Sequence, residues 1–137
     1  MVKAKKTWQE KLDAKKEPKK VRLVHGFGGM AEGELMDVGT PQIVAEYIQG
    51  IPFGEIRTPV ELRNEIARAN QCDGMCPVST GIFLRIAAEA ALEGLDRGES
   101  IEAVIPFWRV VAPDSPTTKK LPVDADWIAD RRQAEQT

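Results

Sequence analysis

The sequence predicts an α+β fold that is mainly helical, with a helix-turn-helix at its centre. Three observations support this prediction. Two segments open with Thr-Pro, at Thr40 and at Thr58, and continue with apolar residues at helical spacing. A longer stripe with the same spacing follows from about residue 79. Two short helices, a connection and a longer helix in this order are typical of a helix-turn-helix.

Length and composition indicate an ordinary globular chain of one domain with a tail. Of its 137 residues, 42% are hydrophobic and 29% are charged. No run approaches the roughly 18 apolar residues that a membrane span needs, and the lysine-rich start lacks the apolar centre of a secretory signal. We therefore expect a cytoplasmic protein with no membrane partner. Cys72, Cys76 and a distant His25 cannot complete a zinc shell, so neither metal nor cofactor is expected.

The net charge of −2 hides an asymmetry along the chain. Residues 1–23 contain nine Lys or Arg and three Asp or Glu, whereas the remainder contains ten basic and eighteen acidic residues. An acidic body can bind nucleic acid only if its few basic side chains gather on one face. We divide the chain into a basic arm with a glycine-rich loop, residues 1–39, and a domain, residues 40–137.

The basic arm itself contains two predicted elements. Thr7 to Lys16 is expected to form a short helix, because Thr7 and Glu10 have the spacing of a capping box. Trp8 and Leu12 lie four residues apart on this helix. We expect the pair to pack on the domain, since so short a helix is marginal alone. A strand is expected at Val21 to Val24.

The two Thr-Pro segments predict the first helices of the domain. Thr40, with proline at the first helical position, opens a helix that ends at about Gln49. Thr58 opens the next helix, which ends at about Ala69, and Glu61 again stands at the capping-box position.

The third helix is the longest and is the candidate recognition helix. Ser79 or Thr80 is expected to cap it, and it ends at about Gly94. Arg85 and Glu89 fall on its outer face. Its buried stripe is expected to consist of Ile82, Phe83, Ile86, Ala87, Ala90 and Ala91.

After this helix the sequence predicts a strand, a loop and a last helix. Val104 to Val111 is rich in β-branched and aromatic residues, which favours a strand. It runs into Pro113 to Pro116, which is typical of a wing-like loop. A last helix is expected from Asp124, and the polar residues from Arg131 to the end are expected to fray.

Two motifs resemble one protein family. Residues 105–111, Ile-Pro-Phe-Trp-Arg-Val-Val, resemble the active-site signature Ile-Pro-Cys-His-Arg-Val-Val of the DNA alkyltransferases that repair alkylated guanine. Residues 51–58, Ile-Pro-Phe-Gly-Glu-Ile-Arg-Thr, are similar to the family's Ile-Pro-x-Gly-x-Val-x-Thr. The resemblance covers Thr40 to Trp127. It implies a winged helix-turn-helix whose recognition helix enters the minor groove, with the damaged guanine flipped beside the signature.

The chemistry of that family is not expected here. Phe107 stands at the position of the nucleophilic cysteine and Trp108 at that of its histidine, and neither a phenyl ring nor an indole can replace a thiolate and its base. The family's tyrosine and arginine also have no counterpart, with Pro59 and Val78 at those positions. Alkyltransferase-like proteins replace the cysteine too and bind alkylated DNA. By that resemblance, Pro106, Phe107 and Trp108 would line a lesion pocket.

The leading hypothesis is a non-catalytic protein that binds double-stranded DNA and prefers alkylated guanine. Its DNA contacts would come from Ser79, Thr80, Arg85 and Arg109. Simpler interpretations stand beside it: Phe107 and Trp108 as core residues, and the two arginines as partners of nearby carboxylates. The alternative function is a winged-helix module that binds a protein and not DNA. A third hypothesis is thiol chemistry at Cys76, which precedes a helix and is otherwise expected to be a buried structural cysteine.

Overall fold

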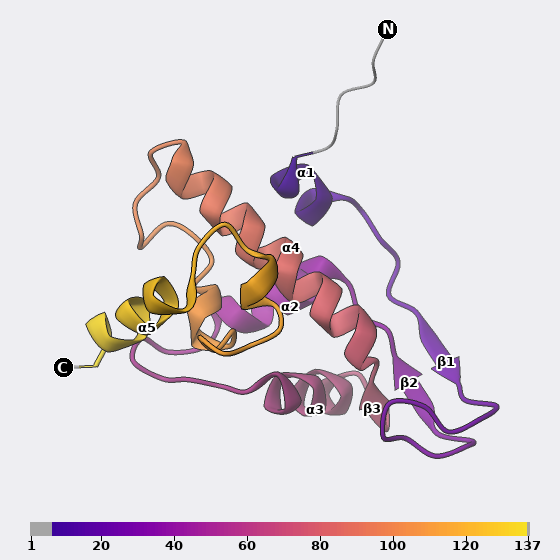
Figure 1. The fold of residues 1–137 in the computed structure, drawn as a ribbon. Coiled ribbons are helices and arrows are strands. Elements are labelled where there is room, and N and C mark those ends of the chain that lie inside the picture. Colours follow the sequence, from indigo (N-terminus) through magenta and orange to yellow (C-terminus); the bar gives the residue numbers. More distant parts are fainter. Residues whose placement is uncertain (1–6, 137) are drawn as a thin grey trace, which may run out of the picture.

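The computed structural model describes residues 7–136 and has an α+β fold, about half helical with one three-stranded sheet (Figure 1). Within these residues no helix is both long and apolar enough to cross a membrane. The elements are α1 (Trp8–Asp13), β1 (Lys20–Arg22), β2 (Leu35–Asp37), α2 (Pro41–Gln49), α3 (Pro59–Ala69), β3 (Gly74–Met75), α4 (Pro77–Asp96), the 3-10 turns η1 (Phe107–Arg109) and η2 (Thr118–Lys120), and α5 (Ala125–Ala134).

The predicted starts of α1, α2 and α3 are confirmed, because each is set by a local cap. The hydroxyl of Thr40 accepts a hydrogen bond from the backbone of Ile43. Thr58 and Glu61 form the expected capping box, in which each side chain accepts from the other's backbone N–H. Thr7 begins α1 in the same way. These signals lie within four residues of sequence and need no tertiary contact.

The helix α4 begins earlier than the sequence predicted. Its N-cap is Cys76, whose Sγ accepts from the backbone N–H of Ser79 at 3.5 Å, and Pro77 occupies the first helical position. The cap expected at Ser79 or Thr80 is therefore wrong. Proline is well suited to this position, because its missing N–H would be unpaired there in any residue. The helix then continues to Asp96, two residues beyond the expected Gly94.

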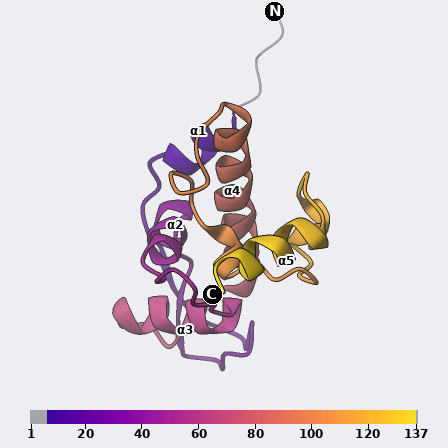
Figure 2. The ribbon, with the colours of Figure 1, turned by 90° about the vertical axis from the view of Figure 1, so that its left-hand side faces the viewer.

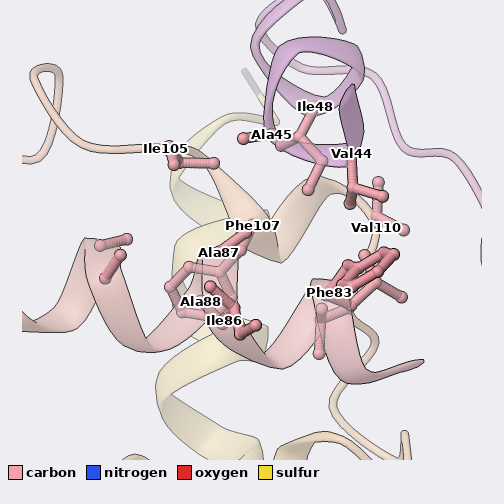
Figure 3. Packing of buried hydrophobic residues seen from close by; sticks show 14 of the residues in the cluster. Val44, Ala45, Ile48, Phe83, Ile86, Ala87, Ala88, Ile105, Phe107 and Val110 are labelled. Carbon is pink, nitrogen blue, oxygen red and sulfur yellow. The ribbon is translucent and has the colours of Figure 1, made fainter. Parts of the chain in front are cut away.

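The core is built around α4. Figure 2 shows this helix upright, with α2 on one side and α5 on the other, and α1 also packs against it. The side chains of α2 and α4 meet those of residues 105–110 in the main cluster (Figure 3). Leu12 of α1 is buried in that cluster, so the expected packing of α1 on the domain is confirmed. Glu89, predicted to lie outside, is buried and pairs with Arg85.

The sheet joins the N-terminal segment to the connection between α3 and α4. β1 pairs antiparallel with β2, and β2 pairs parallel with β3 through Met36 and Gly74. The predicted strand at Val21 to Val24 is present but lies one residue earlier and is shorter. Since β2 contacts β3, residues on both sides of the expected boundary at residue 40 share one sheet.

The strand predicted at Val104 to Val111 is wrong, because this segment folds into η1 and its flanking bends. Phe107, Trp108, Val110 and Val111 are all buried in the main cluster. A strand alternates its side chains between two faces, so it could not place consecutive residues in one core. The turn does so by bending the backbone, and the N–H groups of Val110 and Val111 both donate to the carbonyl of Phe107.

The C-terminal segment is held to the body rather than frayed. Asp124 caps α5 as predicted, but the helix continues through Ala134. The guanidinium of Arg132 donates to the Trp108 carbonyl at 2.7 Å, and Gln136 donates to the Gly54 carbonyl at 2.8 Å. The fraying expected from Arg131 is thus wrong for residues 131–136. Thr137, and residues 1–6 of the predicted basic arm, lie outside the described residues.

Candidate nucleic-acid interface

The first half of α4 exposes an apolar stripe. Val78 is 60% exposed and Ile82 is 55% exposed, at positions i and i+4 of the helix. Gly81 lies beside them, and a side chain at that position would meet no atom within 4 Å. Ile82 was expected in the buried stripe, and that expectation is wrong. Large apolar side chains at this spacing leave a surface on α4 that no described part of the chain covers.

The stripe forms the floor of a groove of about 600 Å³ between α4, α1 and the loop at Pro116. Three cationic side chains line this groove, and none of the described residues that line it is acidic. The cations come from three separate segments: Lys11 from α1, Arg85 from α4 and Lys120 from η2. We call this surface the α4 groove. Its charge is opposite to that of the acidic body.

Arg85 is the one residue of the predicted DNA contacts that both lies on this surface and carries a charge. Its side chain is 39% exposed, and its Nη2 lies 3.4 Å from Oε2 of the buried Glu89. The ion pair that the simpler interpretation expected is therefore present. The guanidinium also lies 5.0 Å from the centre of the Trp8 ring. These contacts hold Arg85 in place and leave part of its side chain open to the groove.

Ser79 and Thr80 differ in their exposure and in their hydrogen bonds. Ser79 is half-buried, and its N–H is used by the Cys76 cap. Thr80 is only 1% exposed, and its hydroxyl donates to the Cys76 carbonyl at 2.7 Å. The side chain of Thr80 is therefore buried in the first turn of α4, which does not favour the DNA contact expected there.

Arg109 is bound within the protein. Its Nε and Nη2 donate to the two carboxylate oxygens of Glu135 at 2.9 and 3.0 Å, and its Nη1 donates to the Ile51 carbonyl. Its side chain is 13% exposed and does not line the α4 groove. Because these contacts already match its donors and its charge, they do not favour the expected DNA contact at Arg109. The simpler interpretation, pairing with a carboxylate, is confirmed.

Glu135 was not predicted as an important residue, yet it is the centre of this network. It also accepts from the Trp108 indole at 2.9 Å and from the Gly54 backbone at 3.3 Å. Burial alone would raise the pKa of its carboxyl group. The hydrogen bonds from Arg109, Trp108 and Gly54 outweigh that effect and hold the pKa below its ordinary value.

The predicted lesion pocket is filled by the protein's own rings. Phe107 is 0% exposed and stacks on Trp127 with ring centres 5.8 Å apart and planes 2° apart, and Trp108 meets its edge at 5.4 Å. Phe107 and Trp108 are core residues, as the simpler interpretation expected. Pro106 is half-buried and, with Phe53, Trp108 and Arg109, lines a second groove of about 770 Å³. Phe107 therefore offers no free face to a flipped base, and Trp108 is only 2% exposed where it lines this groove.

Sequence reasoning missed Lys11, Lys120 and Val78 as parts of the surface. Arg85 could be found from helical spacing alone. The two lysines could not, because Lys11 and Lys120 are more than 100 residues apart in sequence and meet α4 only through the packing of α1 and the path of the loop. The only local signal was Pro77, which places Val78 at the exposed start of the helix.

The third hypothesis, thiol chemistry at Cys76, is not favoured by its placement. Cys76 is buried in a small cluster with Leu23 and Met36, and its sulfur accepts from the Ser79 backbone. Cys72 is half-buried, and burial, followed by the charge of Asp37, raises the pKa of its thiol. A raised pKa lowers the thiolate fraction at neutral pH and with it the reactivity.

No protein-family model, curated protein or solved structure matches this chain. The function is therefore argued from the α4 groove itself.

Proposed function

We propose that this chain binds double-stranded DNA, without catalysing alkyl transfer, through the α4 groove. One observation carries the proposal: an exposed apolar stripe, Val78 and Ile82, is flanked by Lys11, Arg85 and Lys120 with no acidic neighbour in the groove lining. Phosphate neutralisation by basic side chains supplies most of the affinity for a duplex. The position of these cations on one face allows a chain of net charge −2 to approach a polyanion.

The apolar stripe favours the minor groove over the major groove. Proteins that bind the minor groove often place apolar side chains against or between base steps while basic side chains contact the phosphates. Val78 and Ile82 project from one helix face, with Gly81 between them. Because Gly81 has no side chain and faces open space, the backbone of α4 can approach a ligand closely there.

The helix order supports a helix-turn-helix assignment within this proposal. α3 and α4 stand as the two helices of the motif, and β3 lies in the connection between them. The loop that contains Pro116 borders the α4 groove and would be the wing in this proposal, although the strand expected before it is absent from the described residues. The resemblance to the alkyltransferase signature also supports the proposal, because in that family the recognition helix enters the DNA groove.

A fluorescence titration with a plain duplex at two salt concentrations tests the proposal. If the three cations each neutralise one phosphate, log K should fall with log[salt] with a slope of about −2.7, which is about 40-fold between 50 and 200 mM salt. Lys120→Ala should weaken binding and reduce the slope. Lys119→Ala is the matched control, because Lys119 is an exposed neighbour that does not line the groove. No binding at low salt would reject the proposal.

The alternative of a protein-interaction module is favoured by one feature of the same surface. Val78 and Ile82, one helical turn apart, also suit the apolar face of a partner helix. A protein partner that binds the purified chain with nuclease present would favour this function if no duplex is bound at low salt. Ile82→Glu should abolish the binding of that partner. Ile82 is exposed, so this substitution should leave the fold intact.

A further inference from the structure

One carboxylate of α4 caps the start of the short helix α1. Glu93 accepts from the backbone N–H of Trp8 at 2.9 Å and from that of Gln9 at 3.0 Å. The first N–H groups of any helix have no partner within the helix, so Glu93 satisfies two of them from outside. α1 has only six residues and is too short to be stable alone. Its docking therefore depends on Glu93 as well as on the buried side chain of Leu12.

A second set of contacts connects α1 to the α4 groove. The Trp8 ring lies close to two cations, with Lys11 Nζ 4.0 Å and Arg85 Cζ 5.0 Å from its centre. Trp8 and Lys11 both line the groove, as does Lys120. Leu12 anchors the same helix in the core. The docked α1 thus supplies one of the three cations of the groove and packs against a second.

We propose that α1 is part of the nucleic-acid site and that Glu93 is a positioning residue, which keeps Lys11 at the groove although it does not touch the ligand. This inference rests on the proposed function. Docking and binding are then coupled: a duplex that contacts Lys11 binds the docked state more tightly, and so it stabilises α1 on α4 by the same factor.

The coupling can be distinguished from simple charge effects. Removing a carboxylate from a protein normally strengthens its binding to a polyanion, because one repulsion is lost. The proposal predicts the opposite for Glu93→Ala, since the loss of this cap releases Lys11. Asp96→Ala is the matched control: it removes the same charge from an exposed position near the end of the same helix and has no hydrogen bond to α1.

The experiment measures the salt dependence of duplex binding by the full chain with Lys11→Ala, Glu93→Ala and both together. We expect Lys11→Ala to change the slope from about −2.7 to about −1.8, as one phosphate contact is lost. Glu93→Ala should give the same slope, and the double variant should show no further change. Asp96→Ala should keep the slope of the unaltered chain and bind at least as tightly.

Hydrogen exchange on the unaltered chain gives a readout that requires no substitution. The amides of Trp8 and Gln9 should exchange several-fold more slowly when a plain duplex is added, and exchange should be faster in free Glu93→Ala. The inference is overturned if Glu93→Ala leaves the salt slope of binding unchanged, or if the changes in slope caused by Lys11→Ala and Glu93→Ala are additive in the double variant. It is also overturned if the duplex does not slow the exchange of these amides. If the unaltered chain itself shows no salt-dependent binding, the proposed function fails instead.

Discussion

Arg109 and Glu135 form a two-point ion pair that joins the turn η1 to the C-terminal end of α5. Nε and Nη2 of Arg109 each donate to a different oxygen of Glu135, and both side chains are largely buried. Paired donors in this geometry give the strongest of the charge-assisted hydrogen bonds. Arg109 therefore has a structural role in this chain.

The first prediction concerns the stability that this pair contributes. Glu135→Ala leaves the buried Arg109 guanidinium and the Trp108 indole without their acceptor, and should destabilise the fold by about 3 kcal/mol. Urea unfolding followed by circular dichroism measures the change. Glu55→Ala removes an exposed partner of Arg57 and should cost less than about 1 kcal/mol. Equal effects of the two substitutions would contradict this assignment.

The second prediction is a pH dependence that follows from the lowered pKa of Glu135. A carboxyl group whose pKa is lower in the folded state stabilises the fold above its unfolded value, 4.5, and that contribution is lost as the pH falls through the folded pKa. The free energy of unfolding should therefore decrease below pH 4.5. The free energy of unfolding of the Glu135→Gln variant should decrease less steeply over the same pH range. Parallel curves for the two proteins would show that other groups dominate.

The third prediction is that restoring a thiol does not restore alkyl transfer. Phe107→Cys would place a cysteine at a position that is fully buried beneath Trp127 and has no histidine beside it. We expect no transfer to the protein from a duplex that contains an alkylated guanine, together with a loss of about 3 kcal/mol of stability from the vacated ring. Intact-protein mass spectrometry checks the first part. A gain of one alkyl group would contradict the burial argument.

The fourth prediction concerns lesion preference. Because Phe107 is fully buried and Trp108 is only 2% exposed, we expect plain and alkylguanine duplexes of the same sequence to bind with equal affinity. This replaces the preference that the resemblance implied. Competition between the two duplexes at one salt concentration is the measurement. Tighter binding of the alkylated duplex, by tenfold or more, would mean that the stack of Phe107 and Trp127 opens on DNA.

The sequence was sufficient for the elements whose signals are local. Thr40 and Thr58 each predict the start of a helix from signals within one turn, and both helices are present in the structure. The prediction from sequence was wrong where burial determines the backbone conformation. The residues from Phe107 to Val111 have the composition of a strand, but almost all of them are buried in one core. Only a bent backbone allows consecutive residues to do this. The start of α4 was missed because cysteine is an unusual cap, although Pro77 indicated it.

The candidate site was predictable only in part, for a similar reason. The outward direction of Arg85 follows from its place on one helix. The two hydrogen bonds from Arg109 to Glu135 join segments that are distant in sequence, and no local pattern contains that information. The same holds for Lys11 and Lys120, which become neighbours of α4 only in the folded chain.

The parallel pairing of β2 with β3 has a consequence for the order of folding. It brings Met36 beside Gly74, so the intervening segment with α2 and α3 must be compacted before this ladder can close. The backbone N–H of Cys76 donates to the Asp37 carbonyl at 2.8 Å, immediately before α4. We therefore expect the first turn of α4 to be among the last parts of the chain to become rigid during refolding, after the helices that precede it.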